Sequence, residues 1–476
     1  MNKKVAIIVD HPDRDLAGLI LIGTELASRG IDVYFCSHNI ASIELWKIAP
    51  DFVLLNYLRT NNEKLAEEMH RAGIKYGVLD TEGGVFPEMS VFTGALAKSE
   101  YAISNCSGFY CWGNKVKDAL VDLKIFPDNV VDVTGQPRMD FYHDSLSPII
   151  LRGHNDSNEY DDFILVNGVF AFCNPRFSTP EKEVEQSIEL FGIERGKSIA
   201  NQKREREVML KMIDFIKNLA KRYPNEKFVW RPHPFESDKI YSDSFKDLPN
   251  AEVIQKGTVD GWLLKAKALI QVGCSTAFEA GFTGLPVFTP TWIGDIYADP
   301  AIKGVSDNVE SEQLFYEKFD ALLQNKYQYC DSIKENTQKA IDEIYYKNDG
   351  LSYIRVVDKI TSEISPNDGE VNLEKCRHYR NKITINKGDQ IWKKAVKITI
   401  KAFGLAVFFK FGNIHHIENR IIQKWKKTPK YLSPTAFDKI FDELKMSKSN
   451  WEKVSRVEFE SVDLKDDEVF SLKITK

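Results

Sequence analysis

The chain has 476 residues, and its composition of 43% apolar and 28% charged residues excludes a disordered or fibrous protein. A net charge of −5 excludes a polycation that binds nucleic acid across its whole surface. The charge is uneven, because residues 381–430 hold eleven lysines and one arginine against two acidic residues, a balance of +10 that leaves −15 on the remainder. This asymmetry predicts a charged partner surface for residues within 381–430.

Cysteine usage and the apolar runs indicate a reduced, cytoplasmic protein. The seven cysteines are an odd number without a CxxC pair, so neither a zinc ribbon nor a disulfide framework is expected. The apolar run near the start is shorter than the core of a signal peptide. No run approaches the roughly 20 apolar residues that a membrane-spanning helix needs, so we expect at most peripheral contact with a membrane.

Alternating strand and helix signals open the chain. Residues 4–9 read as a buried strand, residues 16–27 as a helix that stops at Gly30, and residues 31–35 as a second strand. Further strands are expected at 52–56, 76–80, 110–112 and 130–135. The series predicts a doubly wound, Rossmann-like α/β domain over residues 1–150.

A second series follows a polar linker at 143–162. Strands are expected at 163–167, 227–233, 268–273 and 285–290, and helices at 202–222, 276–283, 331–346 and 351–363. These elements predict a second Rossmann-like domain over residues 151–365, which leaves residues 366–476 as a basic tail.

Two such domains direct the carboxyl ends of their strands toward one central cleft, where ligands of such sheets bind. No GxGxxG or GxxxxGK[ST] motif follows a predicted strand, so dinucleotide and P-loop binding lack their fingerprints.

Two loops of the first domain carry candidate groups. Asp80 and Glu82 stand at a strand end before Gly83, where carboxylates can act as nucleophile or general base at a sugar carbon and glycine lets the backbone approach a ligand. The alternative is a turn in which Asp80 bonds its own backbone. Arg138 follows the last strand and can meet a phosphate, although the pattern favours a surface pair with Asp140 that contributes little to stability.

Two loops of the second domain carry anion-binding signals. His233 lies between two prolines directly after a strand that ends near Arg231, so its imidazole is held rigidly and can bind phosphate or donate a proton. Ser275 and Thr276 open a helix after another strand, which makes an anion site. Thr276 and Glu279 also fit a capping box, and Glu279 can alternatively accept ribose hydroxyls.

No metal is expected. Asp13-Arg14-Asp15 is a DxD motif, but it falls in the first turn of a predicted helix, where acidic side chains complement the helix dipole. A helix start and His233 can hold a donor phosphate without a divalent cation. The sequence therefore predicts no cofactor beyond the donor substrate itself.

The basic segment, residues 391–430, predicts contact with the cytoplasmic membrane surface. Its lysines interleave with Ile, Val, Trp and Phe in the manner of an amphipathic interfacial helix. Anionic lipid adds roughly 1 kcal/mol for each nearby Lys or Arg. The alternative is a helix that packs on its own protein with solvated lysines. Nucleic-acid binding is not favoured, since no aromatic platform or basic sheet is evident.

Five blocks within about residues 5–300 resemble the bacterial surface carbohydrate biosynthesis proteins, GT-B glycosyltransferases related to the retaining β-Kdo transferases and to other transferases with an HP motif. The blocks are Arg14-Asp15-Leu16, LDTEGG (79–84), GQPRMD (135–140), RPHPFE (231–236) and CSTAFEAGFTGLP (274–286). The resemblance implies a GT-B fold. It also implies that His233, Ser275 and Thr276 grip the phosphate of a cytidine nucleotide, and that a carboxylate at 80–83 faces the anomeric carbon.

Those relatives carry an acidic pair directly before glycine, whereas Thr81 separates Asp80 from Glu82 here. Glu82 is favoured over Asp80 as the nucleophile, and both remain catalytic candidates together with His233. The remaining residues of the predicted substrate- and nucleotide-binding set are Arg14, Gly83, Arg138, Arg231 and Glu279.

The predicted function is metal-independent transfer of a sugar, a Kdo-like sugar from a CMP donor, to a lipid-linked glycan of capsule or lipopolysaccharide. The enzyme would lie on the inner face of the cytoplasmic membrane. Two alternatives remain open. One is a transferase of glycerol or ribitol phosphate from a CDP donor, and the other is a membrane-docked scaffold of a polysaccharide assembly complex.

Overall fold

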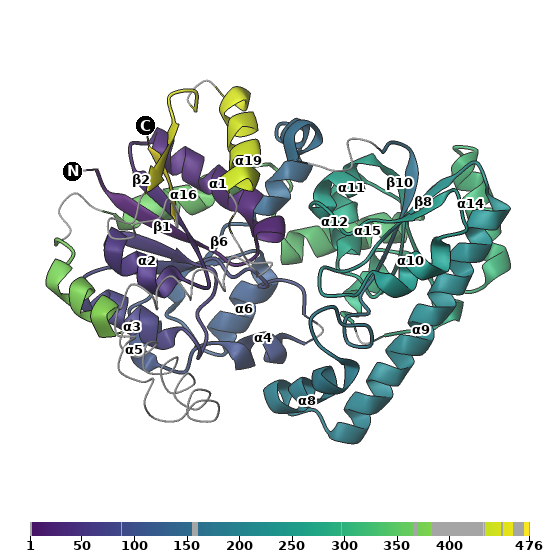
Figure 1. Cartoon of the computed structure of the whole chain (residues 1–476), viewed down its shortest axis with the longest axis horizontal. Helices are drawn as coiled ribbons and strands as arrows, with labels where there is room; N and C mark the ends of the chain where they lie inside the picture. The colour runs from purple at the N-terminus through teal and green to yellow at the C-terminus, as the bar shows by residue number, and fades with distance from the viewer. Residues whose placement is uncertain are drawn as a thin grey trace, which may run out of the picture.

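The computed structural model describes residues 2–86, 88–154, 160–296, 298–364, 369–382, 432, 434–448, 451–459 and 471–475. Two α/β domains lie side by side, each built on its own sheet (Figure 1). All six strands of the second sheet and six of the eight in the first pair in parallel. The predicted GT-B arrangement of two Rossmann-like domains is therefore confirmed.

The first sheet has the strand order β13-β14-β2-β1-β3-β4-β5-β6. Its parallel strands are β1 (Lys4–Val9), β2 (Asp32–Ser37), β3 (Phe52–Leu55), β4 (Lys75–Val78), β5 (Gly108–Cys111) and β6 (Val131–Val133). The helices between them are α1 (Pro12–Ser28), α2 (Ala41–Ile48), α3 (Glu63–Arg71), α4 (Met89–Ala95), α5 (Glu100–Ser104) and α6 (Asn114–Asp122). Val5 and Ile7 of β1 enter one hydrophobic cluster and Ala6 and Ile8 enter another, so the sheet is buried on both faces. This explains why the strands read as continuous apolar runs.

The second sheet has the order β12-β11-β10-β7-β8-β9. Its strands are β7 (Phe163–Gly168), β8 (Lys227–Arg231), β9 (Ala251–Val253), β10 (Ala266–Val272), β11 (Val287–Pro290) and β12 (Asp307–Val309). Its helices are α8 (Pro180–Phe191), α9 (Arg195–Arg222), α10 (Lys239–Phe245), α11 (Val259–Lys265), α12 (Thr276–Thr283), α13 (Ala301–Gly304), α14 (Glu312–Leu323) and α15 (Asp331–Ile344). Helix α8 and the adjoining end of α9 project from the body of the domain, at the bottom of Figure 1.

The sequence places the helix expected at 351–363 in the second domain, whereas the structure packs it on the first. Helix α16 (Ser352–Glu363) packs against α1 of the first domain. Asp140, which is 2% exposed, accepts hydrogen bonds from the backbone N–H groups of Ser352 and Tyr353 at 3.0 and 2.8 Å. A carboxylate at a helix start is favoured by the helix dipole, so this buried contact fixes where the returning chain attaches.

The expectation that residues 366–476 form a separate tail is also wrong for the part that the structure describes. Helix α19 (Pro434–Ser447) lies beside α1, and β14 (Ser471–Thr475) pairs antiparallel with both β2 and β13 (Ser455–Phe459). These elements extend the first domain, in yellow at the top of Figure 1. Residues 373–382 are helical. The basic segment predicted to bind a membrane, 391–430, lies outside the described residues.

Trp451 fixes this carboxyl-terminal addition to the first domain. Its side chain is fully buried, its indole N–H donates to Glu25 Oε2 at 2.9 Å, and its ring meets Tyr353 edge to face. A buried tryptophan with a satisfied N–H contributes both apolar area and orientation. It joins α1, α16 and the carboxyl-terminal addition in one contact.

Trp451→Ala is expected to lower the free energy of unfolding by about 3–5 kcal/mol, because it leaves a large cavity beside α1. The measurement is urea denaturation followed by circular dichroism. Met446→Ala is the matched control, since Met446 lies in neighbouring α19 with 71% of its surface exposed. Equal stability of the two variants would contradict docking of this segment.

Candidate active site

The carboxyl ends of the two sheets meet at the domain junction, which we define by the contacts that cross it. Lys115 Nζ lies 3.0 Å from Asp299 Oδ2, and Tyr142 Oη donates to Glu279 Oε2 at 2.8 Å. Aromatic stacking of Tyr142 on Phe282, with ring centroids 5.5 Å apart, extends one hydrophobic cluster across the junction. The loops that follow the strands of both domains are thereby held in fixed relation.

Asp80 and Glu82 occupy different environments in the turn after β4. Asp80 is fully buried, and its Oδ1 accepts the backbone N–H of Glu82 at 2.9 Å. The expected turn in which Asp80 bonds its own backbone is present. Trp112 Nε1 donates to the carbonyl oxygen of Asp80 at 2.7 Å, and this hydrogen bond holds the turn in place. The Glu82 side chain is 49% exposed, so it is the carboxylate that a ligand can reach.

Two arginines frame the carboxylates. Arg59 Nη2 lies 3.3 Å from both Asp80 Oδ1 and Glu82 Oε2, and Arg14 Nη1 lies 3.6 Å from Glu82 Oε1. Arg14 is itself held by Asp10 and Asp15, at 3.0 and 2.8 Å. Burial raises the pKa of Asp80 to about 6 although Arg59 opposes the shift. Asp80 Oδ2 is buried without a hydrogen-bond partner among the described residues. Asp80 is therefore a buried support, and Glu82 is presented between two guanidinium groups.

The glycines after Glu82 serve packing as well as access. A Cβ on Gly84 would lie 2.5 Å from the Trp112 ring, and one on Gly83 would lie 3.2 Å from Asp80 Cβ. The main chain can approach Trp112 this closely only without a side chain at Gly84.

His233 is held in the loop after β8 as expected. Its Nδ1 accepts the backbone N–H of Phe235 at 3.3 Å, which places the ring proton of the neutral imidazole on Nε2. Burial, followed by the charges of Arg231 and Arg14, lowers the pKa of His233 to about 4. The neighbouring Glu236 is fully buried and accepts the Phe170 backbone N–H at 2.7 Å, which ties this loop to the one after β7.

Arg231 ends β8 and turns into the domain. It donates through Nη2 to the carbonyl oxygen of Gly257, while its buried Nε has no partner among the described residues. Burial lowers the pKa of Arg231, and Asp260 opposes this shift. A guanidinium with an unused N–H is suited to an anionic ligand.

The start of α12 differs from the expected capping box. Ser275, not Thr276, is the N-cap residue, and its side chain makes no capping hydrogen bond. Thr276 Oγ1 donates to Cys274 Sγ at 3.0 Å and accepts from Asn167 Nδ2 at 3.2 Å. The prediction of a capping box is therefore wrong, because the Glu279 side chain contacts Tyr142 and Arg138 of the first domain. Strand β7 separates β8 from β10, so the His233 loop and the α12 start lie about two strand spacings, roughly 10 Å, apart on one sheet edge.

Arg138 corrects another expectation. The surface pair with Asp140 does not form, because Asp140 is buried at the start of α16. Arg138 instead lies over the Trp112 ring, 5.1 Å from its centroid, and reaches 3.7 Å from Glu279 Oε1. Glu279 thus bonds two residues of the first domain, and it is 7% exposed.

Sequence reasoning missed several residues of the junction: His11, Asn56, Arg59, Trp112 and Tyr142. His11 lies two residues after the predicted strand 4–9 and Asn56 is the last residue of the predicted strand 52–56, and these positions at strand ends were the signal that could have identified them. Arg59 gave no such signal, since it lies three residues further along an irregular loop.

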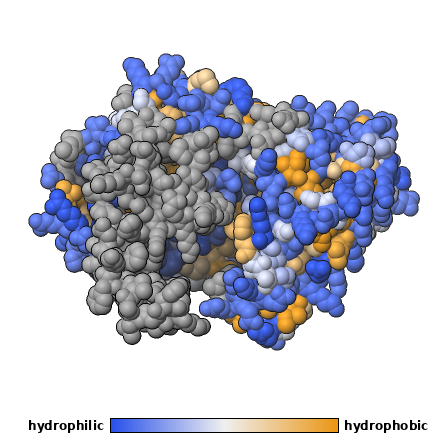
Figure 2. Space-filling view, in the orientation of Figure 1, coloured by the Kyte–Doolittle hydropathy of each residue, from blue (hydrophilic) through white to orange (hydrophobic). Residues whose placement is uncertain are grey.

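Metal-binding clusters and membrane-spanning helices are absent from the described residues. No group of three or more His, Cys, Asp or Glu side chains there is arranged to hold a metal. The described helices also lack one with the length and apolar character needed to cross a bilayer. The described surface of the second domain in Figure 2 is mostly hydrophilic with scattered hydrophobic patches.

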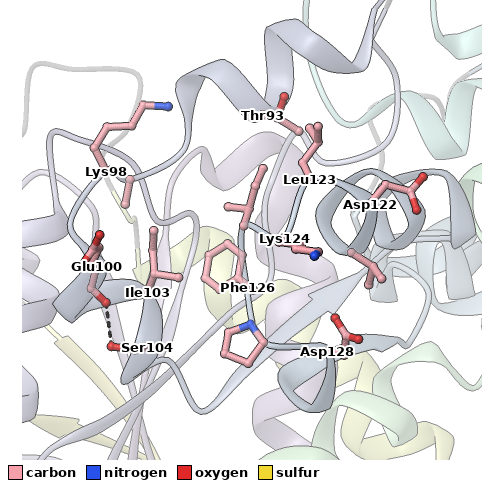
Figure 3. A pocket seen from close by; sticks show the side chains of 14 residues that line it. Thr93, Lys98, Glu100, Ile103, Ser104, Asp122, Leu123, Lys124, Phe126 and Asp128 are labelled. Carbon is pink, nitrogen blue, oxygen red and sulfur yellow. Dashed lines mark hydrogen bonds between the residues drawn. The ribbon is translucent and has the colours of Figure 1, made fainter.

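A separate hollow of about 1000 Å³ lies among α4, α5, α6 and the segment after α6 (Figure 3). Ile103 and Phe126 give it an apolar lining, and Glu100, Asp122 and Asp128 stand around it. It contains none of the predicted site residues.

Comparisons with known proteins give similar solved structures and no sequence family. No protein-family model matches the chain, and no curated protein matches it. The structure of a Listeria monocytogenes protein assigned as a UDP-N-acetylglucosamine 2-epimerase aligns at 12% identity and TM-score 0.49, over 77% of this chain and 98% of that one. The Neisseria meningitidis UDP-GlcNAc 2-epimerase aligns at 16% identity and TM-score 0.48, over 76% and 100%. The wall teichoic acid polymerase TagF aligns at 11% identity and TM-score 0.47, over 75% and 88%. No activity is carried over from these likenesses.

Asp80→Asn tests the buried state of this carboxyl. A carboxyl whose pKa is raised on folding, from 3.8 to about 6, contributes stability that is present below pH 4 and is lost as the pH rises through 6. The stability of the wild type minus that of the variant should therefore fall by roughly 2 kcal/mol between pH 4 and pH 7. Urea denaturation at both pH values measures this difference, and a constant difference would contradict the assignment.

Proposed function

We propose that the protein is a nucleotide-sugar-dependent, metal-independent glycosyltransferase of bacterial surface polysaccharide synthesis. The first domain would supply the reacting carboxylate and the second would bind the donor nucleotide. The observation that carries the proposal is the exposed Glu82 carboxylate, framed by Arg14 and Arg59, at the junction where the loop after β8 and the start of α12 lie in the opposite domain.

Glu82 is the nucleophile in this proposal. Its carboxylate oxygen forms a bond to the anomeric carbon while the bond from that carbon to the donor phosphate breaks, and the nucleotide leaves with the electron pair. The acceptor hydroxyl then attacks the same carbon, loses its proton to water and releases Glu82. Two displacements at one carbon retain its configuration. Asp80 holds the turn through the Glu82 N–H and does not touch the sugar.

The donor phosphate is assigned to Arg231, His233 and the α12 start at Ser275 and Thr276. Arg231 offers an unused Nε–H and His233 a free Nε2–H, both among the described residues. Directed N–H groups and a helix start can offset phosphate charge without a cation. No cofactor is part of the proposal.

The sugar and the acceptor are proposed from the sequence motifs. The LDTEGG and RPHPFE blocks support a Kdo-like sugar and a CMP donor. The composition of the segment 391–430 supports a peripheral position on the inner face of the cytoplasmic membrane, where a lipid-linked glycan would be the acceptor.

A thermal-shift panel of CMP, CDP, UDP and GDP tests the donor class. A hundredfold excess of CMP over its Kd should stabilise the wild type by about 2.7 kcal/mol, and the double variant Ser275→Ala and Thr276→Ala should lose most of this gain. Ser90→Ala on α4 is the control. A response to CDP alone would favour the polyol-phosphate transferase, and no response to any nucleotide would favour the scaffold.

Glu82→Gln is expected to lower kcat by roughly 10⁴-fold, because it removes the nucleophile and leaves the framing arginines in place. Asp80→Asn should lower kcat far less. Both rates are measured as release of CMP in the presence of acceptor, with mass spectrometry to detect a glycosyl-enzyme on Glu82. If the two variants have equal activity, Glu82 is not the nucleophile.

A further inference from the structure

His11 lies at the junction with a fixed main chain. It lies two residues after the end of β1 and is the N-cap residue of α1. Its backbone N–H donates to Asp15 Oδ2 at 3.1 Å, and its carbonyl oxygen accepts the backbone N–H groups of Arg14 and Asp15 at 3.1 and 2.8 Å. The direction of the imidazole is therefore set by the strand and the helix together.

The imidazole itself is unsatisfied. His11 is 7% exposed, and its Nδ1 is buried without a hydrogen-bond partner among the described residues. A buried polar atom left unpaired is destabilising, so such an atom points to a ligand that completes its hydrogen bonding. Asn167 Oδ1 and Arg231 Nε, at the ends of β7 and β8, are unpaired in the same way.

Phe235 links His11 to His233 across the junction. The Phe235 ring meets His11 edge to face with centroids 6.4 Å apart, and it lies at 30° to the His233 ring with centroids 5.7 Å apart. Phe235 is 45% exposed, so it can turn aside without opening a core. One aromatic ring thus borders two imidazoles that come from opposite domains.

The charges around the two imidazoles favour an anion on the His233 side. Arg231, Arg14 and His11 all act on His233, and no carboxylate is among the causes of its lowered pKa. Asp10, Asp13 and Asp15 face His11 together with Arg14, and burial is the main cause of its lowered pKa. Both rings are therefore neutral near pH 7, and each can gain a proton when an anion arrives.

We propose that His11 is a second phosphate-binding imidazole, which the first domain contributes beside His233 of the second. The ligand class is a phosphate ester, and under the proposed function, on which this inference rests, it is the phosphate of the donor nucleotide. The phosphate site is then complete only where the two domains meet. The Phe235 ring lies beside both imidazoles, and it turns away when the phosphate binds between them.

The test compares CMP with cytidine, because the two differ only in the phosphate. Isothermal titration at pH 7 in two buffers of different ionisation enthalpy gives both the affinity and the number of protons taken up. His11→Phe keeps the ring and its packing beside Phe235 but removes both nitrogens. It should weaken CMP about 10–100-fold, the range for one charge-assisted hydrogen bond, and leave cytidine unchanged. Proton uptake with CMP should also fall.

His11→Asn retains an amide near the position of Nδ1 and should recover part of the CMP affinity. His70→Phe is the control, since His70 lies on α3 against Tyr101. Equal weakening of CMP and cytidine, or unchanged CMP affinity and proton uptake in His11→Phe, would overturn the inference. Failure of the wild type to bind any nucleotide would instead overturn the proposed function. Circular dichroism of each variant establishes that it folds. If His11→Phe does not fold, His11→Asn is used for the same comparison of CMP with cytidine.

Discussion

Glu279 is the contact on which the relation of the two domains depends. It is nearly buried in the second domain and bonds Tyr142 and Arg138 of the first, and Arg138 in turn lies over Trp112, the residue that locks the Asp80 turn. A buried carboxylate is costly unless it is paired, so this carboxylate and its two partners hold one another in place. The chain of contacts runs from α12, whose start is assigned to the donor phosphate, to the turn that presents Glu82. The proposed donor and nucleophile sites are thus parts of one connected structure.

The two carboxylates of that turn show how environment divides roles. Asp80 and Glu82 are two residues apart and share Arg59, yet one is buried with a raised pKa and the other is half exposed between two guanidinium groups. Two neighbouring carboxyl groups in one site commonly take different roles when one is buried and the other is exposed to solvent. Here the buried acid shapes the turn, and the exposed acid is the one proposed to react. The same division applies to His233 and Glu236, where the buried carboxyl fixes the loop that carries the imidazole.

Much of the fold was predictable from the sequence, because parallel strands buried on both faces leave apolar runs at regular intervals. Their carboxyl ends meet on one edge, which is why Asp80, His233 and Ser275 could be assigned to one junction. Long-range choices were not predictable. Asp140 was expected on the surface and instead receives the start of α16, 212 residues later. Glu279 fits a capping box locally, and only the packed structure offers it Tyr142. Arg59 was missed because its loop has no periodic pattern, and its partners are set by tertiary contact.

The hairpin of β13 and β14 has a consequence for how the protein is made. The edge strand β2 is covered by β14, and Thr475 bonds Asp32 across a separation of 443 residues. The first domain lacks this strand and α19 until residues 434–475 are synthesised, long after its strands β1 to β6. Contacts so distant in sequence slow folding, and an uncovered sheet edge invites pairing with other chains. The nascent protein therefore passes through a stage in which its second domain can be complete while the β2 edge of its first domain is uncovered, and β14 covers that edge only once residues 471–475 are added.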